Sequence, residues 1–155
     1  MTIASKITSQ LGKLFIIGTA CLVLSSTVLA AEYVSVKKDD VNVRTNAGTK
    51  YPVAMVLFQN YPLRVIKKQG DWYNVADYEK DSGWIHKSLV MKGDSVIVNA
   101  KKSVNMRSGP STKTSIVADV ERGVVLTKIS KKGKWTQVRH STGSVGWIYS
   151  SLLWP

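Results

Sequence analysis

Two histidines, His86 and His140, are the side chains best suited to acid–base or metal chemistry in this chain of 155 residues. Neither belongs to an HxxE-type pattern or to another spacing that suits metal ligands, which argues against a zinc site. The one cysteine, Cys21, lies within an apolar N-terminal run. An acidic cluster at 77–81 has no demonstrable opposing carboxylate, which glycoside cleavage requires. We therefore predict no catalysis, no metal and no cofactor.

Two tryptophans stand at the start of strand-like runs and suit ligand binding better than catalysis. Trp72 precedes Val75 by three residues, and Trp135 precedes Val138 by the same step. Because side chains alternate between the two faces of a strand, an odd separation puts the indole outside if the valine points inside. An exposed indole is a large apolar surface, which favours the floor of a ligand groove. The alternative is packing, either over a barrel end or between two parts of the chain.

Three lysines crowd the turn before the second of these tryptophans: Lys131, Lys132 and Lys134. Ammonium groups beside an aromatic face suit a ligand that carries a carboxylate or phosphate next to an apolar or sugar part. A solvated surface is the alternative interpretation. Because the corresponding turn before Trp72 includes an aspartate, the second stretch is the better candidate for binding.

The two tryptophans belong to an internal duplication with a constant spacing of 63 residues. The register holds without a gap, from VNVR and VNMR to GWIHKSL and GWIYSSL. Such a register predicts two copies of one unit, at residues 32–91 and 96–155, with residues 92–95 as a short polar joint. The second copy is more basic, with ten Lys or Arg against two Asp or Glu.

Both copies consist of short β-branched and aromatic runs between Gly, Asn, Asp and Lys clusters, such as VAMVLF, LRVIKK and DWYNVAD in the first. This pattern is typical of an all-β sandwich or barrel. A unit of about 60 residues buries only about 60% of its unfolded surface and is marginally stable. Closing the sheet hides its edges. We therefore predict an all-β chain with two small barrels in tandem.

The ordered motifs V-N-[VM]-R-[TS], G-x-W-x-x-V and G-W-I-x-x-S-L make both copies resemble the bacterial SH3 domain family. The resemblance implies SH3-like barrels of five to seven strands that bind cell-wall material or proteins and have no catalysis of their own. In the similar eukaryotic SH3 domains, the aromatic at the position of Trp72 lines a peptide groove. His86 and Tyr149 stand in place of the groove proline. Leu89 and Leu152 replace the groove tyrosine, so a proline-rich peptide is not the expected ligand.

The remaining tryptophans and two repeated arginines complete the set of candidate residues. Arg44 and Arg107 follow the VNV and VNM runs, and they either hold a carbonyl or acidic group within the fold or face the groove. We predict structural roles for Trp84, Trp147 and Trp154, the last holding the final strand on the second barrel. The predicted ligand-binding residues are Trp72, Arg44, Tyr78, Trp135, Arg107, Lys131, Lys132 and Lys134.

The first 31 residues are typical of a secretory signal peptide, with lysines but no acidic residue at the start, an apolar middle and small residues at the end. An uncleaved anchor is the alternative, and it would be the only attachment to a membrane. The net charge of +12 predicts attraction to anionic surfaces outside the cytoplasm. The leader argues against nucleic acid as a partner.

These observations predict an exported, non-enzymatic tandem module, monomeric and periplasmic or secreted to the cell envelope, that binds cell-wall peptidoglycan. The alternative is a periplasmic protein-interaction scaffold for an envelope enzyme, a sensor or a host factor, since an exposed strand edge can accept a partner strand.

Overall fold

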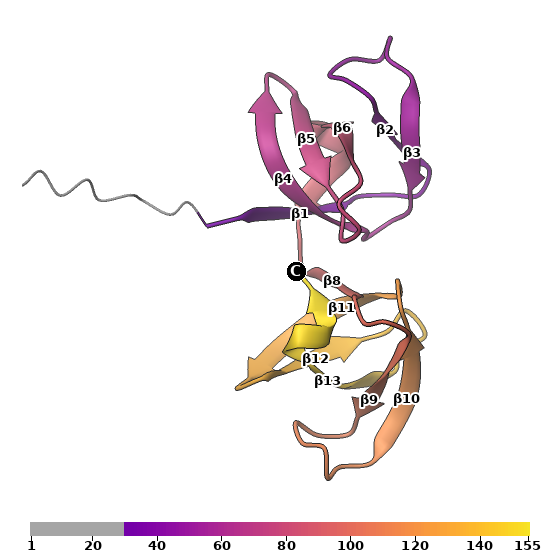
Figure 1. Ribbon diagram of the computed structural model, residues 1–155, viewed down its shortest axis with the longest axis vertical. Coiled ribbons are helices and arrows are strands. Elements are labelled where there is room, and N and C mark those ends of the chain that lie inside the picture. The colour runs from indigo at the N-terminus through magenta and orange to yellow at the C-terminus, as the bar shows by residue number, and fades with distance from the viewer. Residues whose placement is uncertain (1–29) are drawn as a thin grey trace, which may run out of the picture.

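The computed structural model describes residues 30–155, which form two seven-stranded antiparallel sheets, one for each copy of the repeat (Figure 1). The predicted signal peptide lies outside the described residues except for its last two. None of the helical segments within residues 30–155 has the length and apolarity needed to cross a membrane. The predicted all-β fold with two tandem units is confirmed.

The first barrel consists of strands β1–β7 in the spatial order β3-β2-β6-β5-β4-β1-β7. Residues 62–65 of β4 pair with β1 and residues 64–69 with β5, and the β4–β5 ladder is interrupted by a bulge at Ile66. Its elements are β1 (Glu32–Val36), β2 (Val41–Arg44), β3 (Val53–Leu57), β4 (Pro62–Gln69), β5 (Trp72–Ala76), β6 (Ser82–His86), the 3₁₀ turn η1 (Lys87–Leu89) and β7 (Val90–Lys92).

The second barrel repeats this order with strands β8–β14. The Val36 N–H donates to the Tyr61 carbonyl, and the equivalent Val98 N–H donates to Val124, so β1 and β8 are related by 62 residues instead of 63. The loop before β9 is therefore one residue longer. Its elements are β8 (Ser95–Val98), β9 (Ser103–Arg107), β10 (Ile116–Glu121), β11 (Val125–Lys132), β12 (Trp135–Arg139), β13 (Val145–Tyr149), η2 (Ser150–Leu152) and β14 (Leu153–Trp154).

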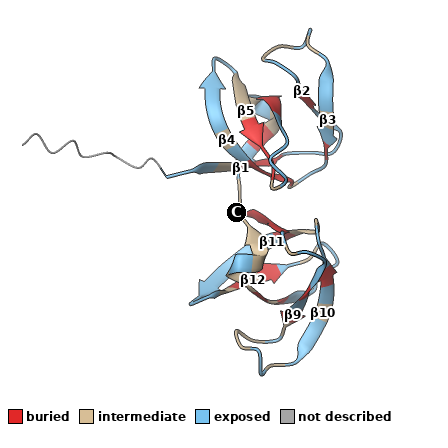
Figure 2. Ribbon diagram, viewed as in Figure 1, coloured by how far each residue is buried: buried red, intermediate tan, exposed pale blue. Residues whose placement is uncertain are grey.

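The same repeated positions form the core of each barrel, and Figure 2 shows the buried segments inside both. The buried side chains include Leu63, Val75 and Ile85 in the first barrel and Leu126, Val138 and Ile148 in the second. The glycine before the second tryptophan of each motif allows a close strand crossing. A Cβ at Gly83 would lie 2.6 Å from Val43 Cγ1 and 2.9 Å from the Arg44 carbonyl oxygen. The glycine of the repeated GW dipeptide is therefore required by the close packing of the neighbouring strand.

Strand β8 belongs to both cores. All four of its residues are buried, which means that both faces of the strand are covered. Val96 packs in the core of the second barrel, whereas Ile97 belongs to the buried cluster of the first. Val125 and Trp154 pair with Ile97 from the two neighbouring strands, and both also pack against the first core. These three side chains form an apolar row, which we call the joint row.

The joint row places the C-terminal tryptophan between the barrels. As predicted, Trp154 belongs to the last strand of the second sheet, through its pairing with Ile97. Its ring, however, packs against the first core and lies edge-on to Tyr33, with 5.6 Å between ring centroids. Figure 1 shows the C-terminus between the two barrels. Trp154 therefore joins the barrels as well as closing the second one.

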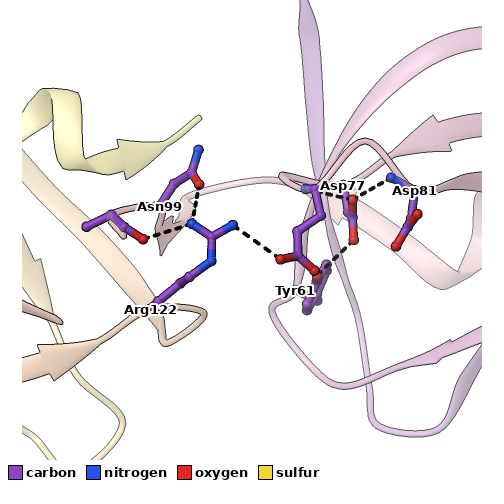
Figure 3. A network of polar contacts seen from close by, with 7 residues as sticks. Tyr61, Asp77, Asp81, Asn99 and Arg122 are labelled. Atoms are coloured by element: carbon purple, nitrogen blue, oxygen red, sulfur yellow. Dashed lines mark hydrogen bonds and ion pairs between the residues drawn. The ribbon is translucent and has the colours of Figure 1, made fainter. Parts of the chain in front are cut away.

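Arg122, in the turn after β10, makes polar contacts across the same joint (Figure 3). Its guanidinium donates to Asn99 Oδ1 at 3.0 Å and to the Ala100 carbonyl at 2.8 Å, both in the second barrel. It also pairs with Glu79 of the first barrel at 3.2 Å and lies 5.1 Å from the centroid of the Tyr78 ring. Because exposed ion pairs contribute at most about 1 kcal/mol, Arg122 orients the barrels more than it stabilises them.

On the side of the first barrel, the polar network is centred on the buried carboxylate of Asp77 (Figure 3). The N–H groups of Glu79 and Asp81 donate to Asp77 Oδ1, both at 2.9 Å. The Tyr61 hydroxyl donates to Oδ2 at 3.2 Å. Burial, and then the charge and hydrogen bond of Asp77, raise the pKa of Tyr61 well above its usual value.

The raised pKa of Tyr61 predicts that alkali destabilises the fold. Tyrosine in the unfolded chain loses its proton near pH 10, whereas Tyr61 retains it in the folded chain. The contribution of the protonated hydroxyl is therefore full below about pH 10 and falls by about 1.4 kcal/mol per pH unit above it. Urea unfolding at pH 8 and pH 11 should show a steeper loss for wild type than for Tyr61→Phe. Equal losses in the two proteins contradict this assignment.

Candidate functional site

The Trp72 ring lies on the outer face of strand β5. The ladder between β5 and β6 is continuous, with Trp72 opposite His86 and Val75 opposite Gly83. Val75 is 1% exposed and belongs to the core, whereas Trp72 is half-buried and does not. The predicted alternation of valine inside and indole outside is therefore confirmed. In the second barrel, Val138 is fully buried and Trp135 is half-buried, which repeats the arrangement.

A second ring holds each of these indoles edge-on. The centroids of Trp72 and His86 are 5.4 Å apart at an interplanar angle of 84°, and those of Trp135 and Tyr149 are 5.5 Å apart at 90°. Edge-to-face geometry is a preferred contact between aromatic rings. His86 and Tyr149 are not among the predicted binding residues. Their direct cross-strand position opposite the tryptophans could have indicated them.

His86 is fixed by the short turn that follows it. Its Nδ1 accepts the Ser88 N–H at 3.3 Å and lies 2.7 Å from Ser88 Oγ, which makes His86 the N-cap of η1. Because Nδ1 accepts a hydrogen bond, the neutral ring carries its proton on Nε2 and can donate it. Tyr149 occupies the same position before η2 without a side-chain capping bond. The two ring pairs therefore offer different polar groups.

An open groove of about 340 Å³ passes over Trp72. It lies where strands β2, β5 and β6 meet the 3₁₀ turn, so aromatic, aliphatic and charged side chains surround one space. Trp72, Arg44 and His86 line it together. The other side chains that line it include Lys38, Asp40, Asn42, Thr49, Ser88 and Leu89.

The two repeated arginines hold the loops beside the candidate sites. Arg44 donates from Nη1 to the Tyr51 carbonyl at 2.8 Å, and Arg107 donates to the Thr114 carbonyl at the same distance. Of the two roles left open for these arginines, the structure shows the hydrogen bond to a carbonyl within the fold for both. Because Arg44 also lines the groove, its remaining guanidinium nitrogens are within reach of a ligand there.

A salt bridge closes the hairpin end beside the groove. Lys87 Nζ lies 2.7 Å from Asp71 Oδ1, immediately before Trp72. This pairing lowers the pKa of Asp71 and raises the pKa of Lys87. Both side chains are largely exposed, so the pair orders the turn and contributes little to stability.

The lysines of the second barrel are divided between the two faces of the β11–β12 hairpin. Lys132 is the direct partner of Trp135 and shares its face. Lys131 pairs with Thr136 and therefore lies on the opposite face. Lys134 lies in the turn, next to Gly133. The structure thus brings one of the three predicted lysines, Lys132, directly beside the indole.

Comparison with known proteins identifies both barrels. The profile of the family described as Bacterial SH3 domain matches residues 37–92 and again residues 100–155. This chain belongs to the bacterial SH3 domain family. The two predicted barrels are thus tandem SH3 domains, and the resemblance found in the sequence motifs is confirmed.

The SH3 tandem is also similar to longer proteins. It is 23% identical over 139 residues to the putative N-acetylmuramoyl-L-alanine amidase YrvJ of Bacillus subtilis (strain 168), covering 83% of this chain and 27% of that protein. Among solved structures it is similar to NlpC2 from Trichomonas vaginalis, with 14% identity, a TM-score of 0.34, and coverage of 81% of this chain and 48% of the other. For NlpC1 from Trichomonas vaginalis the values are 15%, 0.34, 84% and 48%. The chain spans about a quarter of the curated relative and about half of these solved chains.

Tyr78 lies apart from the other candidate residues of the first SH3 domain. It packs partly against the first core, and the Arg122 guanidinium covers its ring. Burial raises the pKa of its hydroxyl. Tyr78 therefore sits at the joint between the SH3 domains, whereas Trp72, Arg44 and His86 meet at the groove.

Proposed function

We propose that this tandem SH3 protein is an exported, non-enzymatic module that binds cell-wall peptidoglycan through the Trp72 groove. The observation that carries the proposal is the half-buried indole of Trp72, which stands nearly perpendicular to the His86 ring and lines a groove that also contains charged side chains. An indole face suits a sugar ring or an aliphatic stem, and Lys38 and Arg44 suit carboxylates. Peptidoglycan combines these groups in one polymer.

Family membership supports the same ligand class. The curated relative is named as an N-acetylmuramoyl-L-alanine amidase, and N-acetylmuramoyl-L-alanine is a unit of peptidoglycan. Its similarity to this chain covers only 27% of its length. A shared region that is a fraction of the relative suits attachment to the polymer, with the cleavage chemistry elsewhere. The predicted leader and the basic charge agree with a place in the cell envelope, at an anionic surface.

Sedimentation with purified sacculi tests the proposal. Trp72→Ala should weaken binding of the leader-free protein by about tenfold or more, because losing the burial of one indole face removes a few kcal/mol of favourable contact. Ile66→Ala is the matched control, since Ile66 is an exposed apolar residue outside the groove. If Trp72→Ala sediments as well as this control, the groove assignment is wrong. Incubated sacculi should release no soluble fragments.

The second barrel is tested in the same assay. If the basic hairpin adds an electrostatic contribution, binding by wild type weakens steeply as the salt concentration rises. The triple variant Lys131→Glu, Lys132→Glu, Lys134→Glu should bind more weakly at low salt and lose most of this salt dependence. Trp135→Ala should lower affinity without changing the salt dependence. Wild-type behaviour of all these variants assigns binding to the first barrel alone.

A protein-interaction scaffold is the second candidate function, and two edge strands favour it. Strands β3 and β10 are the outermost strands of their sheets. Val56 on β3 is 57% exposed, and Ile116 and Val117 on β10 are also exposed. Apolar edges of this kind can pair with a partner strand. Stoichiometric recovery of an envelope protein, without affinity for sacculi, favours this function.

A further inference from the structure

A second concave site lies between the two SH3 domains. A cleft of about 400 Å³ is lined by Asp39 and residues 58–60 of the first barrel, and by residues 123–127 and 139–141 of the second. It is separate from the Trp72 groove, because the two share no lining residue. Interfaces between domains are a common location for small-ligand sites.

The walls of this cleft are held in a fixed relation. The joint row of Ile97, Val125 and Trp154 packs into the first core. Arg122 adds polar contacts from the turn beside the cleft to both barrels. Ile97 is fully buried, so separating the barrels would expose core surface to water. The cleft therefore exists before any ligand arrives.

The first wall presents an aromatic ring. Phe58 is 47% exposed and lines the cleft. Its ring lies edge-on to Tyr61, with 5.2 Å between centroids, and Tyr61 is anchored by its hydrogen bond to Asp77. Phe58 is thus a positioned apolar surface.

The opposite wall presents donors that the fold does not use. Among residues 30–155, the Arg139 guanidinium has no hydrogen-bond or ion-pair partner, in contrast to Arg44, Arg107 and Arg122. His140 is fixed through Nδ1, which accepts the Thr142 N–H at 3.3 Å, so Nε2 remains free to donate. Both side chains line the cleft. They suit a carboxylate.

The first wall also supplies an acceptor. Asp39 Oδ1 accepts the Gln59 N–H at 2.8 Å, which fixes the carboxylate and leaves Oδ2 available. No ion pair engages Asp39 within the described part of the chain. Asp39 and Arg139 therefore offer opposite charges from opposite walls of the cleft. The ring of Phe58 adds an apolar surface to the same cleft.

The side chains that line the cleft are not repeated in the two copies. The 63-residue spacing relates Phe58 to Glu121 and Gln59 to Arg122, and it relates Arg139 to Ala76 and His140 to Asp77. At these repeated positions, the aromatic ring occurs only in the first copy and the arginine only in the second. Each wall of the cleft therefore comes from a different barrel, and a chain with one barrel has no such site.

We propose that this cleft binds the zwitterionic amino-acid end of a peptide, which carries an ammonium and a carboxylate on one aliphatic stem. Asp39 receives the ammonium, Arg139 and His140 receive the carboxylate, and the stem lies on Phe58. The proposal rests on the proposed function only for the source of such a peptide, since the stem peptides of peptidoglycan have ends of this chemistry.

Titration calorimetry with two synthetic tripeptides tests the cleft in the leader-free chain. One ends in meso-diaminopimelate, whose side chain has an ammonium and a carboxylate, and the other ends in lysine amide, which keeps the stem and the ammonium but has no carboxylate at that residue. The diaminopimelate peptide should bind about tenfold more tightly. Arg139→Gln and Phe58→Ala should each weaken its binding by about tenfold, and Asp39→Asn by several-fold. Arg139→Gln should leave the weaker lysine peptide unaffected.

Matched controls separate the cleft from general effects of charge and of apolar surface. Arg64→Gln removes an exposed arginine outside the cleft and should bind the diaminopimelate peptide like wild type. Ile66→Ala, which removes an exposed apolar residue outside both the cleft and the groove, should also bind this peptide like wild type. The cleft assignment is overturned if neither peptide binds, or if Arg139→Gln and Phe58→Ala bind as well as Arg64→Gln. Sacculus binding that persists in that case leaves the groove assignment intact, so the two proposals fail separately.

Discussion

Replacing Gly146 with valine is expected to remove a large part of the folding stability of the second barrel. A Cβ at this position would lie 2.5 Å from Met106 Cγ and 2.9 Å from the Arg107 carbonyl oxygen. The backbone contact cannot be relieved by a change of rotamer, so β9 has to move away from β13. Overpacking of this kind costs about 3 kcal/mol or more, a large part of the roughly 5–15 kcal/mol that stabilises a small domain. Thermal and urea unfolding measure the loss.

The matched comparison uses alanine at two glycines of the same barrel. Gly133 has a φ of +56°, and no atom lies within 4 Å of an added Cβ. Gly133→Ala should therefore cost only the conformational penalty of about 1–2 kcal/mol, whereas Gly146→Ala already introduces the steric conflict. Asparagine tolerates positive φ, so Gly133→Asn should be milder still. Equal stability of Gly146→Ala and wild type is incompatible with a close strand crossing.

Ile97→Ala is expected to destabilise the first barrel, although residue 97 belongs to the second copy of the repeat. Ile97 is 0% exposed and packs in the buried cluster of the first barrel. Truncation of a buried isoleucine costs about 2–5 kcal/mol. Hydrogen exchange should therefore accelerate first in β5 and β6, the central strands of the first barrel. A first barrel expressed without β8 and β14 should be less stable than the same barrel in the tandem.

Val96→Ala is the control, because its side chain is on the opposite face of the same strand. Val96 is 1% exposed and packs in the core of the second barrel. Hydrogen exchange in this variant should accelerate first in β12 and β13. If both variants accelerate exchange in the second barrel only, the barrels are independent and the joint row has no structural role.

Local patterns in the sequence were sufficient to predict the barrels and the ring that floors the groove. The register of the repeat, the alternation between Trp72 and Val75 and the glycine-rich turns depend on neighbours within one strand or one hairpin. The pairing of Trp72 with His86 was within reach of the same reasoning, because a tight hairpin fixes which residues face each other. The carbonyl bonds of Arg44 and Arg107 are equally local, each spanning seven residues.

Contacts between the barrels were beyond reach from the sequence, because they join segments that have no common register. The sequence predicts Tyr78 as a binding residue, and the structure places it at the joint, where the Arg122 guanidinium covers its ring. By contrast, Lys131 and Lys132 face opposite sides of the hairpin through ordinary alternation along β11, so their separation was within reach of the sequence.

The sequence by itself determined the number of barrels, their all-β class and the outward direction of one indole in each, because hydrophobic alternation and turn residues act over a few neighbouring positions. Only the tertiary structure decided that Ile97 and Trp154 complete the core of the other barrel, and that Phe58 and Arg139 face one cleft. The physical reason is that burial across the joint depends on the shapes of two folded surfaces. Each of these surfaces exists only after its own sheet has closed.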